Sequence, residues 1–220
     1  MESTLHHQLK EKYAVGGETE VTLGRYRIDA VNHGELIEVQ CASLSAIRGK
    51  CQQLLTGHSL RVVKPITLRT RIAKSKRPGG PIVSRRLSPK RGSVLELFEQ
   101  LIYFIDVFPH KNLVIEVPLL HVEEKRIPRK RKSRWWQKDF RVEDVRLESI
   151  ETTLQLKVPS DLIDILHLPA PLDPFNTSDL AEMIDQPRWM AQQIAYVLRK
   201  TGAIEQVKRE RSGVIYRRAA

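Results

Sequence analysis

The chain has 220 residues, of which 37 are Lys or Arg and 26 are Asp or Glu, so the formal net charge is +11 at pH 7. This length allows one large domain or two small ones, and the excess of cations favours a polyanionic partner, with nucleic acid ahead of an anionic membrane surface. Two cysteines without CxxC spacing exclude a disulfide scaffold and a zinc cluster. No run of about 18 to 20 consecutive apolar residues is present, which predicts a soluble protein without a membrane partner. We expect it in the cytoplasm, or in the nucleus if the source is eukaryotic.

The first segment alternates between helical and strand patterns. Residues 4–14 and 44–55 have helical periodicity, whereas residues 20–31, 35–42 and 60–66 have the pattern of strands. The order predicts a mixed α/β core.

The middle of the chain contains basic and apolar stretches in turn. Residues 69–92 hold nine Lys or Arg, three Pro and three Gly, which predicts an exposed basic loop. A capping box at Ser93 predicts a buried helix over 93–108, and residues 112–124 read as a strand that is kinked or ended at Pro118. A further strand over 147–158 and a short helix over 160–168 follow. Three prolines at 169–174 mark the boundary between domains 1–168 and 172–220.

The C-terminal segment has the pattern of two short helices and a hairpin. Asn176 or Thr177 caps the first helix, and Pro187 and Gly202 bound the second. Cations then alternate around an Arg-Ser-Gly turn. Helix, turn, helix and basic hairpin resemble the winged-helix family over residues 172–220. The resemblance implies nucleic-acid contacts, and the residues that would make them are Arg188, Gln192, Gln193, Arg199, Lys208, Arg209, Arg211, Arg217 and Arg218. The alternative is a dimerisation or protein-docking module.

A second basic loop, residues 125–138, combines cations with two tryptophans. The cations suit a phosphate backbone and a tryptophan suits stacking on an unpaired base, so the expected contacts are Arg129, Lys130, Arg131, Lys132, Arg134, Trp135 and Trp136. The alternative is that the tryptophans pack under the aliphatic stems of Lys and Arg. The basic run would then be a solvated surface segment or a nuclear-localisation tag.

Two carboxylates are predicted to face each other across a hairpin. With a two-residue turn at His33 and Gly34, Asp29 falls opposite Glu38, on the face shared with Arg27 and Gln40. Facing carboxylates repel unless a cation or a shared proton offsets them, and oxygen ligands that include the Val39 carbonyl suit Mg²⁺ or Mn²⁺. A solvent-facing Asp and Glu without function is the alternative.

This arrangement resembles the PD-(D/E)xK nuclease superfamily over roughly residues 4–66, with an αβββαβ core of restriction-endonuclease type. The resemblance implies phosphodiester hydrolysis at a metal held by Asp29 and Glu38. Gln40 stands where the superfamily has lysine, so Lys50 on the following helix is the candidate replacement. A carboxylate from the first helix often completes such sites, which favours Glu11 over Glu18 and Glu20. His6 and His7 are expected on a solvated helix turn.

Together these features predict a metal-dependent endonuclease that docks nucleic acid, with DNA ahead of RNA, through its C-terminal module and basic loops. Cleavage of both strands of a duplex would suit a homodimer. One alternative is a catalytically inactive, nuclease-like DNA-binding regulator or adaptor, with Gln40 as the mark of lost catalysis. Another is a component of a larger assembly that holds a protein partner through its C-terminal module.

Overall fold

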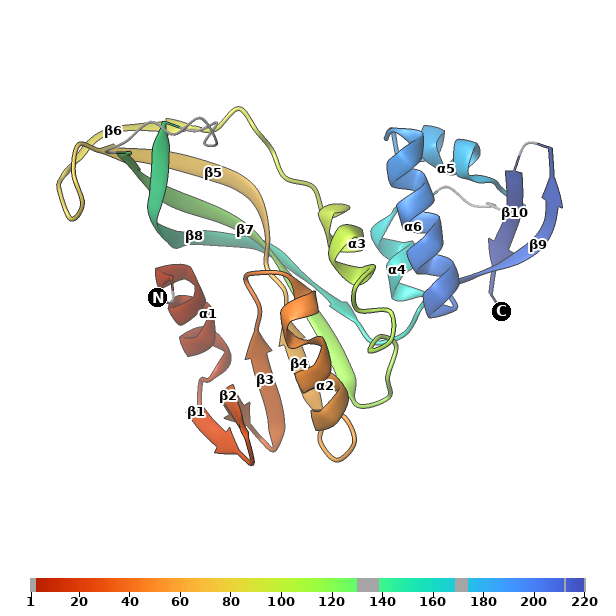
Figure 1. Cartoon of the computed structure of the whole chain (residues 1–220), viewed down its shortest axis with the longest axis horizontal. Helices are drawn as coiled ribbons and strands as arrows, with labels where there is room; N and C mark the ends of the chain where they lie inside the picture. Colours follow the sequence, from red (N-terminus) through yellow and green to blue (C-terminus); the bar gives the residue numbers. More distant parts are fainter. Residues whose placement is uncertain (1–2, 130–138, 169–173, 212, 220) are drawn as a thin grey trace. The chain divides into compact units, whose positions relative to one another are not determined.

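The computed structural model describes residues 3–129, 139–168, 174–211 and 213–219, and these form a mixed α/β structure (Figure 1). Two short C-terminal strands pair separately from one larger mixed sheet. Within the described residues this sheet has eight strands in the order β1-β2-β3-β4-β7-β5-β6, with β8 paired to β7. In chain order the elements are α1 (Thr4–Tyr13), β1 (Glu18–Leu23), β2 (Tyr26–Asn32), β3 (Glu35–Val39), the 3-10 helix η1 (Leu44–Ile47), α2 (Arg48–Leu54), β4 (Leu60–Val63), β5 (Ile66–Ser75), β6 (Ile82–Leu87), α3 (Glu96–Leu101), β7 (Leu113–Pro128), β8 (Phe140–Leu156), α4 (Asp161–Ile165), α5 (Thr177–Met183), α6 (Arg188–Thr201), β9 (Ile204–Glu210) and β10 (Gly213–Arg218).

Two compact units are built from segments that interleave along the chain. The first contains residues 1–41, 63–93 and 117–154, and the second contains residues 42–62, 94–116 and 155–220. The order α1, β1, β2, β3, α2, β4 has one strand more than the helix, strand, strand, helix, strand order read from residues 4–66.

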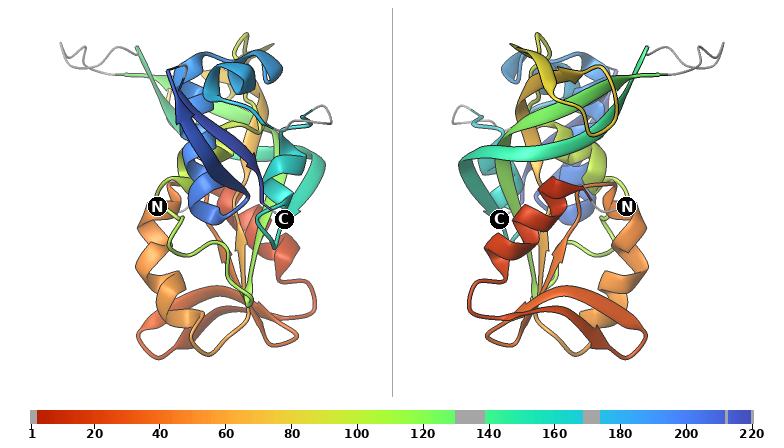
Figure 2. Two further views of the ribbon diagram at one scale, coloured as in Figure 1. Left: turned by 90° about the vertical axis from the view of Figure 1, so that its right-hand side faces the viewer. Right: turned by 90° about the vertical axis from the view of Figure 1, so that its left-hand side faces the viewer.

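In the first unit, helix α1 covers an apolar face of the sheet (Figure 2). Ser3 caps the helix by accepting a hydrogen bond from the His6 backbone N–H, and Leu5 and Leu9 point into the core. Their partners there are aliphatic side chains of the strands, Ala30, Ile37, Val39, Val63, Leu120 and Val122. Two side-chain hydrogen bonds also tie α1 to β8, because Thr4 donates to Asp144 and Gln8 accepts from the Leu147 N–H. Burial and these bonds together fix the helix on the sheet.

The strand expected over residues 20–31 is two strands. β1 and β2 pair antiparallel, and the Leu23–Tyr26 pair closes a two-residue turn that contains Gly24. Gly24 has φ of 58°, a left-handed conformation that glycine adopts at little cost. The first hairpin of the sheet therefore precedes the hairpin that carries Asp29.

The prediction of an exposed basic loop over residues 69–92 is wrong, because much of this segment forms the hairpin β5–β6. β5 pairs antiparallel with β6 and parallel with β7. Ile72 and Ala73 are buried, and Arg71 and Arg85 form ion pairs with Glu148 of β8 and Glu123 of β7. Partners distant in sequence stabilise strands that the local composition disfavours.

The strand after residue 112 does not end at Pro118, and the helix after Ser93 is shorter than expected. β7 continues through Pro118, and its ladder with β5 begins at Leu119, so β5 requires no N–H from the proline. The helix after Ser93 spans only Glu96–Leu101 and lacks a side-chain cap. The following segment forms turns in which the backbone N–H groups of Phe104 and Phe108 bond carbonyls three or four residues earlier.

In the second unit, the C-terminal helices and hairpin have the expected order. Asn176 and Asp179 form a capping box on α5, and Gly202 ends α6 with φ of 84°. Helix α6 contacts α3, α5 and β9, and it buries Ile194 and Leu198. Antiparallel β9 and β10 follow. Among the helices that the structure describes, none is long and apolar enough to cross a membrane.

We predict that Gly17→Ala destabilises the first unit by about 1 to 3 kcal/mol through overpacking. A Cβ atom at this position would lie 2.1 Å from the Val31 carbonyl oxygen, which is backbone and cannot rotate away. The measurement is the urea midpoint of unfolding. Gly49→Ala in α2 is the control, because a Cβ there meets nothing within 4 Å and alanine favours the helix. Equal midpoints for the two variants would contradict the prediction.

Candidate functional site

The hairpin β2–β3 has the register expected from the sequence. His33 and Gly34, with φ of 47° and 80°, form its two-residue turn, and Ala30 pairs with Ile37. The side chains of Ile28, Ala30, Ile37 and Val39 are buried, each 4% exposed or less. This register places Asp29 and Glu38 at neighbouring positions on adjacent strands.

The Asp29 carboxylate lies at the open end of this hairpin, where it bonds backbone of β3. Asp29 Oδ2 accepts a hydrogen bond of 2.8 Å from the Val39 N–H. Across β1 the regular register skips the Glu20–Asp29 pair, and Glu20 has φ of 59°, which is uncommon for a residue other than glycine. The local irregularity accompanies a cluster of charged groups at this end of β1 and β2.

Helix α1 supplies the basic side chains of the cluster. His6 and Lys10 lie one turn apart on the same helix face. His6 Nε2 lies 2.7 Å from the Val39 carbonyl oxygen and 3.5 Å from Asp29 Oδ2. Lys10 Nζ lies 3.7 Å from Asp29 Oδ1 and also bonds Glu20, which in turn pairs with Arg27. The prediction that His6 lies on a solvated turn is wrong, because its side chain is only 19% exposed.

Burial and charge act in opposite directions on these carboxyls. Burial raises the pKa of Asp29, but hydrogen bonds from His6 and the Val39 N–H, together with the charges of His6 and Lys10, bring it below its ordinary value. The pKa of Glu20 is lowered chiefly by its hydrogen bond from Lys10. The negative charge of Asp29 is therefore balanced by protein groups.

A second lysine lies beside the end of β3. Lys64 is 5% exposed, and its Nζ donates to the Cys41 carbonyl oxygen at 3.4 Å. The Gln40 N–H bonds the Val63 carbonyl, which places Lys64 next to the Glu38-Val39-Gln40 segment. Burial lowers the pKa of Lys64, although the charge of the Cys41 thiolate would raise it. Sequence reasoning missed Lys10 and Lys64. The available signal for Lys64 was a lysine between Val63 and Pro65, and for Lys10 it was a position one residue after Leu9 in a predicted helix.

The structure separates several of the residues expected in one site. Glu38 lies on β3 and is 5% exposed. Glu11, in contrast, lies on an exposed face of α1 and pairs with His7. Lys50 lies on α2, in the second compact unit. Within the described residues, no group of three or more His, Cys, Asp or Glu could hold a metal ion, so Glu11 does not complete a set with Asp29 and Glu38.

The residues expected to contact nucleic acid fall into three groups. Lys130, Arg131, Lys132, Arg134, Trp135 and Trp136 lie outside the described residues, whereas Arg129 is described and its Nε donates to the Phe140 carbonyl. On α6, Arg188 and Gln192 are exposed, and Gln193 is half-buried with no bond to its Oε1 among the described residues. The hairpin β9–β10 exposes Arg209 and Arg211, while Lys208 and Arg217 pair with Glu210 and Glu205.

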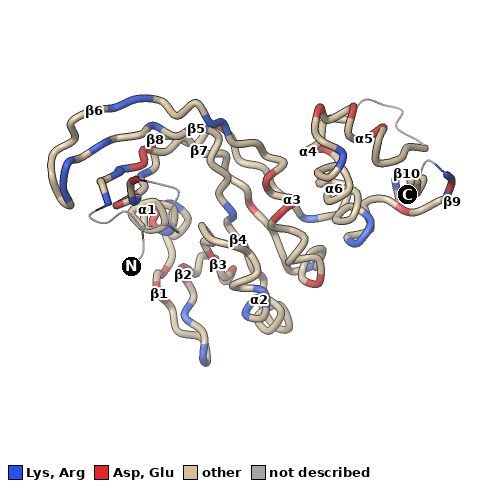
Figure 3. The backbone as a smooth tube through the Cα atoms, turned by 45° about the horizontal axis from the view of Figure 1, so that its top comes forward, with Lys and Arg blue, Asp and Glu red and all other residues tan. Residues whose placement is uncertain are grey.

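Exposed cations gather on and after the hairpin β5–β6 (Figure 3). Six of them form no ion pair within the described chain and are called here the β5–β6 cations: Lys74, Lys76, Arg77, Arg86, Lys90 and Arg91. Two cavities adjoin this hairpin, at the end of β7 and the start of β8.

Residues 3–157 match a family described as a domain of unknown function (DUF8091). The chain belongs to the DUF8091 family. A relative in Treponema pallidum (strain Nichols), described as an uncharacterized protein, is 28% identical over 184 residues, which are 82% of this chain and 72% of the relative. No solved structure matches the chain. The DUF8091 match includes the whole cluster around Asp29 and both cavities, and it ends before α4.

We predict that Asp29→Asn flattens the acid limb of the stability profile of this DUF8091 protein. The folded pKa of Asp29 lies below its ordinary value, so its contribution is complete above about pH 4 and is lost as the pH falls through the folded pKa. At pH 7 the variant should lose about 1 to 3 kcal/mol. Unfolding free energies measured by urea titration between pH 3 and 7 test this.

Glu11→Gln is the control for that experiment, because Glu11 is exposed on the same helix and, among the described residues, forms an ion pair with exposed His7 alone. It should change the profile little. A profile of Asp29→Asn that parallels the wild type at every pH would refute the assigned role of the carboxylate.

Proposed function

We propose that this DUF8091 protein binds nucleic acid through the surface of the hairpin β5–β6. The observation that carries the proposal is the set of β5–β6 cations, which are exposed and form no ion pair within the described chain. Each cation that contacts a phosphate releases a condensed counterion, and this release favours binding. The net charge of +11 provides the same attraction at longer range.

The distribution of ion pairs supports a partner from outside the chain. Neighbouring cations of the same sheet are neutralised internally, as in the pairs Arg71–Glu148, Arg85–Glu123 and Lys125–Glu143. The β5–β6 cations pair with no carboxylate in the part of the chain that the structure describes. Exposed charges of this kind contribute little to folding stability, so stability does not explain their density on one hairpin.

The C-terminal elements offer a second surface for the same partner. Two helices followed by a hairpin have the order of a winged helix, and Arg188, Gln192 and Arg199 are exposed on α6. These side chains have the donors and amides that read base edges or bond phosphates. The ion pairs on β9–β10 reduce the free charge of that hairpin, so the β5–β6 cations supply the larger share of phosphate contacts in this proposal.

We predict that Lys74→Ala combined with Arg86→Ala reduces the salt dependence of nucleic-acid binding. Removal of two phosphate contacts should make the slope of log K against log salt shallower by roughly 1.4 to 1.8. Fluorescence anisotropy with labelled DNA and RNA between about 50 and 200 mM salt measures the slope. The control is Lys12→Ala with Arg25→Ala, which removes two exposed cations elsewhere in the first unit. Binding by the wild type that hardly changes with salt would point to a protein partner instead.

A second candidate function, metal-dependent phosphodiester hydrolysis, is favoured by the surroundings of His6. The Val39 carbonyl oxygen and Asp29 Oδ2 both lie beside His6 Nε2, at 2.7 and 3.5 Å. Imidazole nitrogen, carboxylate and carbonyl oxygen are a donor set that accepts Mn²⁺ more readily than Mg²⁺. His6, Asp29 and the Val39 carbonyl would hold the ion, which when bound supplies an activated water and stabilises negative charge. Lys64 is the nearby cation that would replace the lysine absent at Gln40.

We predict for this second candidate that purified protein cleaves DNA or RNA in Mn²⁺ and that Asp29→Ala lowers the rate by about 100-fold or more. Glu11→Gln on the exposed face of α1 should retain the wild-type rate. Cleavage of single-stranded, duplex and branched substrates is followed on gels. An inert wild type on all substrates, or equal activity of Asp29→Ala, would refute hydrolysis and leave nucleic-acid binding in place.

A further inference from the structure

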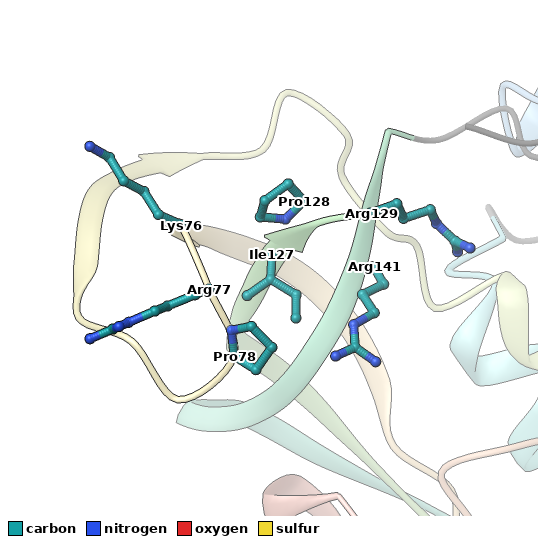
Figure 4. Close-up of a pocket in the computed structure, with 7 residues that line it drawn as sticks. All are labelled: Lys76, Arg77, Pro78, Ile127, Pro128, Arg129 and Arg141. Carbon is teal, nitrogen blue, oxygen red and sulfur yellow. The ribbon is translucent and has the colours of Figure 1, made fainter. Parts of the chain in front are cut away.

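A cavity of about 500 Å³ lies where the turn between β5 and β6 meets the end of β7 and the start of β8. Its lining combines four cations with three apolar residues: Lys76, Arg77, Arg129 and Arg141, and Pro78, Ile127 and Pro128. Figure 4 shows Ile127 between Lys76 and Arg77 on one side and Arg129 and Arg141 on the other. The volume lies within the range of sites that hold small organic groups.

Among the described residues, no carboxylate lines this cavity. The acid nearest to Arg141 along β8 is Glu143, which pairs with Lys125 at 2.9 Å and accepts the Gly79 N–H at 2.8 Å. Those bonds from Lys125 and Gly79, more than the charge of Arg141, hold the pKa of Glu143 below its ordinary value. Lys76, Arg77 and Arg141 thus lie around the cavity and form no ion pair within the described residues, which favours an anion from solution.

The apolar part of the lining narrows the chemistry of that anion. Pro78 and Pro128 are exposed and form an apolar wall, and Ile127 is buried beside them. A free phosphate or sulfate gains nothing from such a wall, whereas the face of a base or sugar does. Cations beside apolar surface are the combination by which proteins hold a nucleotide of an unpaired strand.

A second cavity, of about 370 Å³, adjoins the first because both include Ile127 and Pro128 in their lining. Its lining includes the cations Lys74, Arg86 and Arg126, the carboxylate of Asp139 and an aromatic ring, Phe140. The Arg126 guanidinium, which also pairs with Glu124, lies 4.0 Å from the centre of that ring. Three cations against one carboxylate keep this cavity basic, and two adjoining basic cavities suit two successive units of a polymer.

We propose that these cavities hold consecutive nucleotides of a single-stranded nucleic acid, with phosphates bonded by Arg77 and Arg141 and bases against the two prolines and Phe140. This proposal rests on the proposed nucleic-acid binding and names the form of the ligand. A base can place its face against these side chains only when it is neither paired nor stacked in a duplex, so a single strand fits the cavities better than a duplex does. The second cavity and the remaining β5–β6 cations favour a strand over a free nucleotide, because one nucleotide would leave them unoccupied.

The experiment compares four ligands by fluorescence anisotropy and competition at one salt concentration. They are a single strand of about ten nucleotides as DNA, its RNA equivalent, the matching duplex, and thymidine monophosphate as unlabelled competitor. The wild type should bind either single strand at least about 10-fold more tightly than duplex. Thymidine monophosphate should fail to displace the strand at concentrations well above that of the protein.

Arg77→Ala combined with Arg141→Ala should weaken single-strand binding by about 10-fold or more and duplex binding by less than about 3-fold. Arg77→Lys with Arg141→Lys, which keeps both charges, should recover part of the loss. Lys12→Ala with Arg25→Ala removes the same amount of charge outside the cavity. This control should weaken the binding of single strand and duplex slightly and equally. A thermal unfolding midpoint for each variant shows that it is folded.

Single-strand binding by the Arg77 and Arg141 double alanine variant that equals the control would overturn the assignment of the cavity and leave nucleic-acid binding intact. Preference for duplex, or displacement by micromolar thymidine monophosphate, would likewise overturn it. A wild type that binds none of the nucleic acids would refute the proposed function and this inference together.

Discussion

Lys10 brings a positive charge into the first unit at 4% exposure, where its ammonium group meets the carboxylates of Glu20 and Asp29. Removing an ammonium group from water costs several kcal/mol, and only close carboxylates and hydrogen bonds offset such a cost. The buried charge therefore requires one specific rotation of α1 about its axis and one specific register between β1 and β2, because only these bring the carboxylates to the ammonium group. Leu5 and Leu9 contribute burial to the same contact, but apolar packing alone tolerates more than one rotation.

The same interaction sets the chemistry of the hairpin end. A carboxylate pair on adjacent strands requires compensation, and the sequence suggests a divalent cation for that purpose. In the folded protein Lys10, His6 and the Val39 N–H already surround Asp29, so its charge is balanced without an ion. Binding of Mn²⁺ at this place would have to compete with those contacts, which is why hydrolysis stands second to nucleic-acid binding.

Cations of the first unit thus divide into two classes by their partners. Lys10 of α1, and the cations that face Glu123, Glu143 and Glu148, are neutralised within the chain. Lys74, Lys76, Arg77 and Arg86 of the β5–β6 hairpin form no ion pair within the described residues, and they line cavities that also contain apolar side chains. A count of Lys and Arg along the sequence treats both classes alike. The distinction determines which basic residues are available to phosphate, and it favours the hairpin β5–β6 over the β9–β10 hairpin.

The sequence by itself determined the features that depend on near neighbours. The His33-Gly34 turn, the register that follows from it, the first helix, and the caps at Asn176 and Gly202 are local, because propensity and alternation over a few residues decide them. Tertiary structure decided whatever depends on distant partners. Residues 69–92 became strands because β7 and β8 supply the ladder and the carboxylates, and His6 became a partner of Asp29 because α1 lies across the hairpin end. Long-range pairing overrides local composition in these places, and no pattern along a single chain reveals which distant group will arrive.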